Sequence, residues 1–389
     1  MKKVKLGDVC KIQSGGTPSR GNLNYWNNGN IPWVKISDIK EKYLSRTEEF
    51  ITQEGLANSS AKIFPKETIL YTIFATLGEV SILEIEATTN QAIAGLQIID
   101  ENICKDYLYY YLISLKPFVN EIGRGVAQNN INMQILRNFE IPLPSLEEQK
   151  AIARKLDKVS GLIEKRKTQL EKLSELVKSR FIEMFGDPNS NPMHWNKVEL
   201  AECLINIENG KSFVCDSEPR IGEKPAVLKL SAATYGYYQP HENKAMLDDT
   251  LFVESAEVHK GDLLFTRKNT PELVGMCAYV YDTPSKLMMP DLIFRLNTRA
   301  NCDKVFLWKI INLDLFRSNI TALSSGSAKS MSNISKERLL GLEIILPPIA
   351  LQQQFAAFVE HTDKSKFEIQ QSLEKLEILK KSLMQQYFG

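Results

Sequence analysis

Four polar loops hold the side chains of this sequence that are best suited to chemistry. They lie at residues 14–20 and 123–130 in the first half and at 266–270 and 324–330 in the second. Glycines in such loops let backbone N–H groups approach a phosphate, and Ser, Thr and Lys add phosphate contacts. Arg can hold guanine through two hydrogen bonds, and Asn or Gln can hold adenine. The loops therefore suit duplex DNA, although composition alone favours ordinary surface loops equally.

The candidate DNA-binding residues lie in these loops or follow a neighbouring predicted strand. We expect Arg20, Arg124, Arg267 and Lys329 to contribute most, because each is a cation among small polar residues. The full set is Ser14, Thr17, Ser19, Arg20, Lys35, Arg124, Gln128, Asn129, Lys229, Arg267, Lys268, Asn269, Ser327, Lys329 and Ser330.

Motifs for catalysis, cofactors and metals are missing from the sequence. It has no G-x-x-x-x-G-K-[ST] phosphate loop, and its six cysteines form no C-x-x-C pair. Pro347-Pro348 lacks the amide and aromatic neighbours of an adenine methyltransferase motif. We therefore expect a non-catalytic protein with no metal or cofactor of its own. A stand-alone methyltransferase or nuclease is the alternative that these absences disfavour.

The composition is that of an ordinary globular protein. The chain has 389 residues, enough for two or three domains, of which 43% are hydrophobic and 24% charged. Lys and Arg number 48 against 47 Asp and Glu, a net charge of +1, which excludes binding of polyanions through bulk charge. Widely spaced cysteines favour reduced, mostly buried thiols. No apolar stretch approaches a membrane span of about 18 residues. We expect a cytoplasmic protein with no membrane partner.

The chain repeats itself at an offset of 203 residues. EIPLPSL at 140–146 corresponds to EIILPPI at 343–349, and LEKL at 170–173 recurs at 373–376. The preceding regions repeat more loosely: Leu6–Gly15 resembles Leu200–Gly210, and the segment 35–37 resembles 229–231. The sequence is thus a globular half and a linking segment, followed by a second copy of both.

The two linking segments predict long helices. Each contains apolar residues alternately three and four apart, interrupted in places by polar side chains, which is an imperfect heptad pattern. Helices of matched length and register favour one intramolecular coiled coil, and the connectivity requires it to be antiparallel. Two separate surface helices are the alternative. Residues 150–180 carry ten Lys and Arg against four Asp and Glu. This basic stretch indicates either a solvated face or a surface that binds DNA or an acidic partner.

These elements predict an α+β fold. Short apolar runs indicate strands, for example at 68–74 and 262–265, and helical patterns occur at 107–115 and 305–313. We expect two similar mixed α/β domains, separated by two long helices that form the antiparallel coiled coil, with pseudo-two-fold symmetry. The predicted boundaries are 1–146, 147–186, 187–349 and 350–389.

The chain resembles the specificity subunit of type I restriction-modification systems. The resemblance rests on SGGTPSR at 14–20, GNIPWVKISDI at 29–39, LPSLEEQ at 143–149, FTRKNTPELVG at 265–275 and LPPIALQQQ at 346–354. It implies two target recognition domains, each binding one half of a split, asymmetric DNA site. The unequal loops at 125–132 and 326–334 then imply different half-sites.

The resemblance also implies partners. Two modification subunits would dock on the helices, and restriction subunits would join them; S-adenosylmethionine, ATP and Mg²⁺ would be bound by these partners. The candidate docking residues are Gln149, Leu170, Leu173, Gln352, Leu373 and Leu376. A coiled-coil adaptor whose globular ends bind proteins instead of DNA remains the alternative.

Overall fold

The structure, a computed structural model, describes residues 3–124, 130–324 and 331–389, with the side chains of residues 122–124 not included. The chain divides into two compact units. Unit 1 comprises Met1–Lys167 and Gln371–Gly389, and unit 2 comprises Thr168–Gln370. Each unit therefore contains one globular domain together with the adjoining parts of two long helices. We call residues 1–146 the first domain and residues 187–349 the second domain.

The first domain is built on two sheets. The larger has five strands in the order β2-β9-β6-β7-β4, and the smaller has three in the order β5-β3-β8, with β8 parallel to β3. The strands of the larger sheet are β2 (Cys10–Ser14), β9 (Ile93–Ile98), β6 (Ile69–Thr72), β7 (Val80–Leu83) and β4 (Tyr43–Leu44); those of the smaller are β5 (Glu49–Ile51), β3 (Ile31–Val34) and β8 (Thr88–Thr89). The predicted strand at 68–74 is confirmed as β6.

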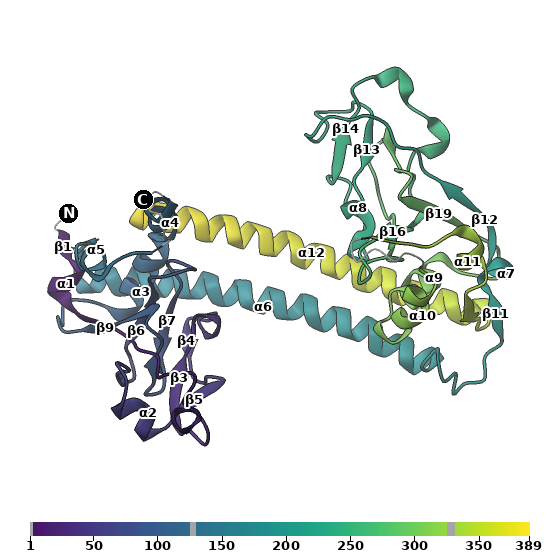
Figure 1. The fold of residues 1–389 in the computed structure, drawn as a ribbon. Helices are drawn as coiled ribbons and strands as arrows, with labels where there is room; N and C mark the ends of the chain where they lie inside the picture. Colours follow the sequence, from purple (N-terminus) through teal and green to yellow (C-terminus); the bar gives the residue numbers. More distant parts are fainter. Residues whose placement is uncertain (1–2, 125–129, 325–330) are drawn as a thin grey trace. The chain divides into compact units, whose positions relative to one another are not determined.

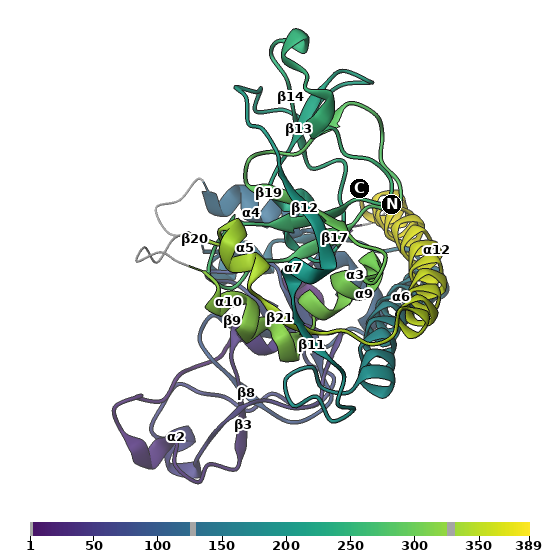
Figure 2. The ribbon, with the colours of Figure 1, turned by 90° about the vertical axis from the view of Figure 1, so that its right-hand side faces the viewer.

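The second domain repeats this connectivity. Its larger sheet has the order β12-β19-β15-β17 and its smaller sheet the order β14-β13-β18, again with the last strand parallel to the middle one. These strands are β12 (Leu204–Asn209), β19 (Ile293–Thr298), β15 (Leu263–Thr266), β17 (Cys277–Tyr279), β14 (Asn243–Ala245), β13 (Ala226–Leu228) and β18 (Leu287–Met288). Figure 2 shows β13 and β14 standing apart from the larger sheet of this unit. The two domains share a topology although their sequences match only loosely.

Short helices complete each domain, and four of the five stand at corresponding places in the two domains. The first domain has α1 (Leu6–Val9), α2 (Gln53–Ala57), α3 (Lys105–Ser114), α4 (Lys116–Arg124) and α5 (Met133–Arg137). The second has α7 (Leu200–Cys203), α8 (Ser231–Thr234), α9 (Lys304–Ile311), α10 (Arg317–Ala322) and α11 (Lys336–Leu340). The predicted helices at 107–115 and 305–313 are thus confirmed as α3 and α9.

A two-stranded sheet closes each domain just before a long helix. β1 (Lys3–Lys5) pairs antiparallel with β10 (Glu140–Pro142), and β11 (Lys197–Glu199) pairs antiparallel with β21 (Glu343–Ile345). The chain then enters α6 (Leu146–Phe185) and α12 (Ile349–Phe388), each one unbroken helix of 40 residues (Figure 1). Gly186 follows α6 with a φ of 76°, the left-handed conformation that suits a glycine at a helix end.

Within each unit the two long helices pack in opposite directions. In unit 1 the Lys155 ammonium, near the start of α6, donates to the hydroxyl of Tyr387, near the end of α12, at 3.2 Å. Further along α6, Glu164 and Lys167 line the same cavity as Lys380. In unit 2 the end of α6 meets the start of α12, where the rings of Phe181 and Phe355 lie 5.5 Å apart. None of the helices in the described ranges is both long and apolar enough to cross a bilayer.

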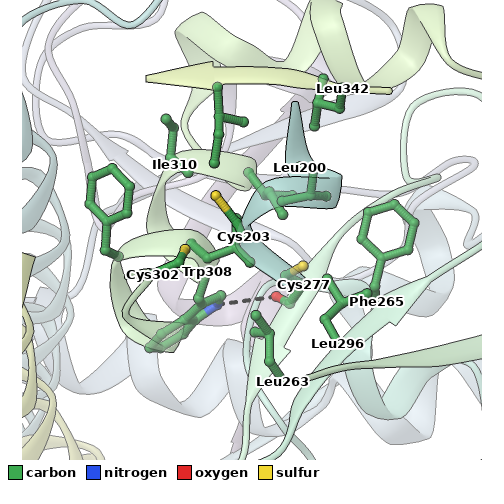
Figure 3. Packing of buried hydrophobic residues seen from close by; sticks show 14 of the residues in the cluster. Leu200, Cys203, Leu263, Phe265, Cys277, Leu296, Cys302, Trp308, Ile310 and Leu342 are labelled. Atoms are coloured by element: carbon green, nitrogen blue, oxygen red, sulfur yellow. Dashed lines mark hydrogen bonds between the residues drawn. The ribbon is translucent and has the colours of Figure 1, made fainter. Parts of the chain in front are cut away.

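Each unit has its own hydrophobic core, to which the long helices contribute. In unit 1 the apolar faces of β2, β6, β9 and α3 pack with Leu156 of α6. In unit 2 the corresponding elements pack with Phe181 of α6 and Val359 of α12. Figure 3 shows this second core, in which the Trp308 indole N–H donates to the Cys277 carbonyl at 3.1 Å. Burial of most thiols is confirmed, since four of the six cysteines are buried: Cys10, Cys203, Cys277 and Cys302.

Candidate nucleic-acid interface

The loop after the first strand of each larger sheet is held at the same place in both domains. The amide of Gly15 donates to Ile93 O at 3.0 Å, and that of Gly210 donates to Ile293 O at 3.3 Å. A Cβ on Gly15 would lie 2.0 Å from Thr89 Oγ1, and one on Gly210 would lie 2.1 Å from a backbone oxygen. Only glycine allows so close an approach. The predicted correspondence of Leu6–Gly15 with Leu200–Gly210 is therefore confirmed.

A hydroxyl fastens each of these loops to the turn just before the opposite strand. Thr17 Oγ1 donates to Gln91 Oε1 in the first domain, and Ser212 Oγ donates to Asp291 Oδ1 at 2.5 Å in the second. Sequence reasoning missed Gln91, Ser212 and Asp291. The position of Gln91 and Asp291 could have revealed them, because each stands two residues before the isoleucine with which β9 or β19 begins.

Arg20 is held by its own domain. Its guanidinium carbon lies 3.7 Å from the ring centroid of Trp26 and 4.6 Å from that of Trp33, and Nη1 donates to Glu49 Oε2 at 2.5 Å. The same carboxylate lies 3.4 Å from Lys35 Nζ. Hydrogen bonding from Arg20 keeps the pKa of Glu49 below its usual value. Internal partners therefore already offset the charges of the two predicted cations.

Ser14 and Ser19 have mainly backbone roles in the described fold. Ser14 is the last residue of β2 and pairs with Ala94. Ser19 accepts a hydrogen bond from the Trp26 indole at its carbonyl oxygen, at 3.1 Å. Both hydroxyls remain candidate contacts to DNA.

The loop 266–270 joins a second segment of the second domain. Arg267 lies over the Phe294 ring at 5.1 Å and donates to Asn333 Oδ1 at 3.2 Å. β16 (Lys268–Asn269) pairs with β20 (Ser332–Asn333), and the corresponding place in the first domain has an isolated bridge between Phe74 and Asn130. This edge therefore brings together the predicted loop and the residue after the loop 324–330.

The prediction for Asn269 needs correction. Its side chain is only 8% exposed, and its amide donates to Thr234 Oγ1 at 3.1 Å. A buried amide with a protein partner cannot hold a base edge. Lys268, half-buried beside it, remains a candidate. The predicted Gln128, Asn129, Ser327, Lys329 and Ser330, and the side chain of Arg124, lie outside the described residues.

Comparison with known proteins identifies the family. The family model described as "Type I restriction modification DNA specificity domain" matches residues 1–174 and again residues 192–380. The chain belongs to this type I restriction-modification specificity family. Its two matches coincide with the two copies of the topology above, so each domain with the adjoining helix corresponds to one family repeat.

Relatives in this specificity family cover the chain to different extents. The MjaIX specificity subunit of Methanocaldococcus jannaschii is 36% identical over 232 residues, 54% of this chain and 52% of the relative. The chain thus spans about half the length of that relative. The EcoKI specificity subunit of Escherichia coli (strain K12) is 22% identical over 398 residues, 94% of this chain and 83% of the relative.

A solved structure supports the fold. The S subunit of the type I restriction-modification system from M. genitalium matches with a TM-score of 0.63 over 100% of this chain and 96% of that chain. At 15% identity, this match concerns the fold alone.

Two of the predicted docking residues of this specificity-family chain have another role. Gln149 and Gln352 are fully buried. Gln149 Oε1 accepts from the amide of Cys104 at 2.8 Å, and its Nε2 donates to the carbonyls of Asn102 and Pro144 at 2.8 and 3.0 Å. We call this set of three hydrogen bonds a glutamine clamp. The prediction that these amides contact a partner is wrong for this conformation, because no atom of either side chain reaches the surface.

The clamp is repeated in unit 2. Gln352 Oε1 accepts from the amide of Asp303 at 2.8 Å, and Nε2 donates to the carbonyls of Asn301 and Pro347 at 3.1 and 2.7 Å. Each clamp joins the first turns of a long helix to the start of α3 or α9. The family repeat therefore keeps the joint between domain and helix, with every backbone partner in the same place.

The predicted leucines are not the most exposed apolar residues of the helices. Leu170, Leu173 and Leu376 are half-buried, and Leu373 is buried. More exposed apolar side chains lie outside the heptad pattern: Leu162, Leu176, Phe367, Ile378 and Leu379. Apolar residues outside the heptad pattern could have indicated this exposed surface, and sequence reasoning overlooked them. Among the described residues, no group of three His, Cys, Asp or Glu side chains is placed to hold a metal ion.

Proposed function

We propose that the chain is the DNA-recognition subunit of a type I restriction-modification enzyme and performs no catalysis itself. Each domain would bind one half of an asymmetric, bipartite target. The observation that carries this proposal is one topology present twice, with different side chains on corresponding loops. Gln91 and Phe74 of the first domain stand at the places of Asp291 and Lys268 in the second. Different side chains on one scaffold imply two different half-sites.

The helices would set the distance between the half-sites. Forty residues at 1.5 Å per residue give about 60 Å, more than the roughly 34 Å of one DNA turn. The opposite directions of α6 and α12 within each unit support a single antiparallel coiled coil with a pseudo-two-fold axis. The exposed apolar residues of the helices would dock two modification subunits, which would bind S-adenosylmethionine. Restriction subunits would add ATP-driven translocation and Mg²⁺-dependent cleavage. A cytoplasmic location would follow from this assignment.

Methylome sequencing of the host with and without the gene tests the proposal. We expect a split adenine-methylated motif that disappears on deletion and returns with the intact gene. Purified full chain should then shift a duplex with this motif in preference to one with scrambled half-sites. Equal shifts of the two duplexes would refute DNA recognition and favour the protein-binding adaptor.

A further inference from the structure

One place in the duplicated fold differs sharply in charge between the two domains. In the smaller sheet of the first domain, Trp33 of β3 pairs with Glu49 of β5. In the smaller sheet of the second domain, Val227 of β13 pairs with Lys244 of β14. Each middle strand is followed by a lysine, Lys35 or Lys229. A carboxylate of the first domain is therefore replaced by an ammonium group in the second.

In the first domain this place is filled and neutralised. The Trp33 ring and the Arg20 guanidinium occupy it, and the Trp33 indole donates to Gly16 O at 3.0 Å. Glu49 lies within ion-pair distance of both Arg20 and Lys35, and Glu48 lies 2.7 Å from Lys35 Nζ. Neither cation has an unpaired charge to offer a ligand.

In the second domain the same place is a pocket. Val227 stands in place of the tryptophan and lines a cavity of about 470 Å³, together with apolar and polar neighbours. The lining residues that matter here are Val227, Pro290, Ser212, Ser231, Lys229 and Lys244.

Two lysines stand on the rim. Neither Lys229 nor Lys244 has a carboxylate within 4 Å among the described residues. The nearby carboxylates are engaged with the rim hydroxyls. Glu242 accepts from Ser231 Oγ at 2.7 Å, and Asp291 accepts from Ser212 Oγ at 2.5 Å. Hydrogen bonding from Ser231, and then the charge of Lys229, hold the pKa of Glu242 below its usual value.

We propose that this pocket of the second domain binds a phosphate group of the DNA backbone, and that the matching place in the first domain binds none. Two ammonium groups with no carboxylate within 4 Å are typical phosphate partners, whereas the two rim hydroxyls already donate to Glu242 and Asp291. The inference rests on the proposed DNA recognition and adds that the two domains divide the phosphate contacts unequally.

The test compares three variants of the full chain: Lys229→Gln, Lys244→Gln and, as matched control, Lys35→Gln. Affinity for the duplex with the methylated motif is measured between 50 and 200 mM salt. Each lost phosphate contact lowers the slope of log K against log salt by about 0.9, so the affinity lost over this range becomes about threefold smaller. We expect this change for Lys229→Gln and Lys244→Gln and an unchanged slope for Lys35→Gln. Lys244→Glu gives this place the negative charge that Glu49 has in the first domain. It should lower the slope by about as much as the loss of two contacts.

The outcomes distinguish failure of the proposed function from failure of the pocket assignment alone. If the wild-type chain does not prefer the methylated motif over the scrambled duplex, the proposed function fails and the pocket assignment fails with it. If the wild-type chain discriminates but the Lys244 variants keep its salt slope, only the pocket assignment is refuted. A loss for Lys35→Gln equal to that for Lys244→Gln would also overturn it. Lys244 is exposed, and circular dichroism verifies that its variants are folded.

Discussion

The glutamine clamp of unit 2 predicts a large stability change from one substitution. Gln352→Leu keeps the approximate volume of the side chain and removes all three of its hydrogen bonds. The amide of Asp303 and the carbonyls of Asn301 and Pro347 then lose their side-chain partner in a region closed to water. Because the clamp connects α12 to the start of α9, the substitution weakens the joint between helix and domain.

The expected loss of unfolding free energy follows from the backbone groups that are left without a hydrogen-bond partner. Each buried donor or acceptor without a partner costs about 1–3 kcal/mol, so three partly relaxed groups cost about 3 kcal/mol. For a cooperative unit of this size, 1 kcal/mol shifts the melting temperature by about 2–4 °C, which gives a fall of about 6–12 °C. Gln149→Leu removes the same three kinds of hydrogen bond in unit 1 and should have a similar effect.

Differential scanning calorimetry of the full chain at pH 7 measures this effect. Gln353→Leu is the matched control, because residue 353 is the exposed neighbour on the same helix. If the units melt separately, Gln352→Leu shifts one transition and Gln149→Leu the other. A shift for Gln352→Leu within about 2 °C of the control would refute the clamp as a source of stability.

Three further predictions concern charge and length. Lys309→Met should stabilise unit 2 by up to about 2 kcal/mol at pH 7 in urea unfolding, because burial lowers the pKa of Lys309 to about 8 and its charged form is penalised below that pH. Asp363 loses Lys309 at 3.6 Å and keeps Lys366 at 3.5 Å, which limits the gain. The penalty fades towards the unfolded pKa, so an equal gain at pH 9.5 would contradict this origin. Glu49→Gln should release Arg20 and Lys35 for phosphate and steepen the salt dependence of DNA binding by up to about 1, and an unchanged slope would show that both cations stay away from DNA. Seven residues added at matched places to α6 and α12 keep the heptad and lengthen each helix by about 10 Å, so the methylated motif should gain about three spacer base pairs with unchanged half-sites; methylome sequencing would show an altered half-site if this is wrong.

The sequence predicted the helices and strands well, because the duplicated halves show the same pattern twice. Apolar runs located β6 and β15, and the repeated helical segments located α6 and α12 to within a residue or two. Side-chain partners were less accessible. Arg20 looks available in the sequence, yet Glu49 lies 29 residues away on a strand whose register no local pattern gives. Gln149 and Gln352 look exposed at the start of amphipathic helices, and only the fold shows that α3 and α9 cover them.

The two copies differ in a way that explains what a specificity scaffold must keep. Contacts that position the chain are the same in both: the close approach of Gly15 and Gly210, the hydroxyl that fastens the next loop, and both glutamine clamps. Most of these contacts end on backbone atoms, which every residue supplies, so they tolerate divergence around them. The side chains at the rim have changed in charge and size, as Trp33 and Glu49 against Val227 and Lys244 show. A scaffold fixed by such contacts can therefore exchange its rim side chains without losing the fold of either domain.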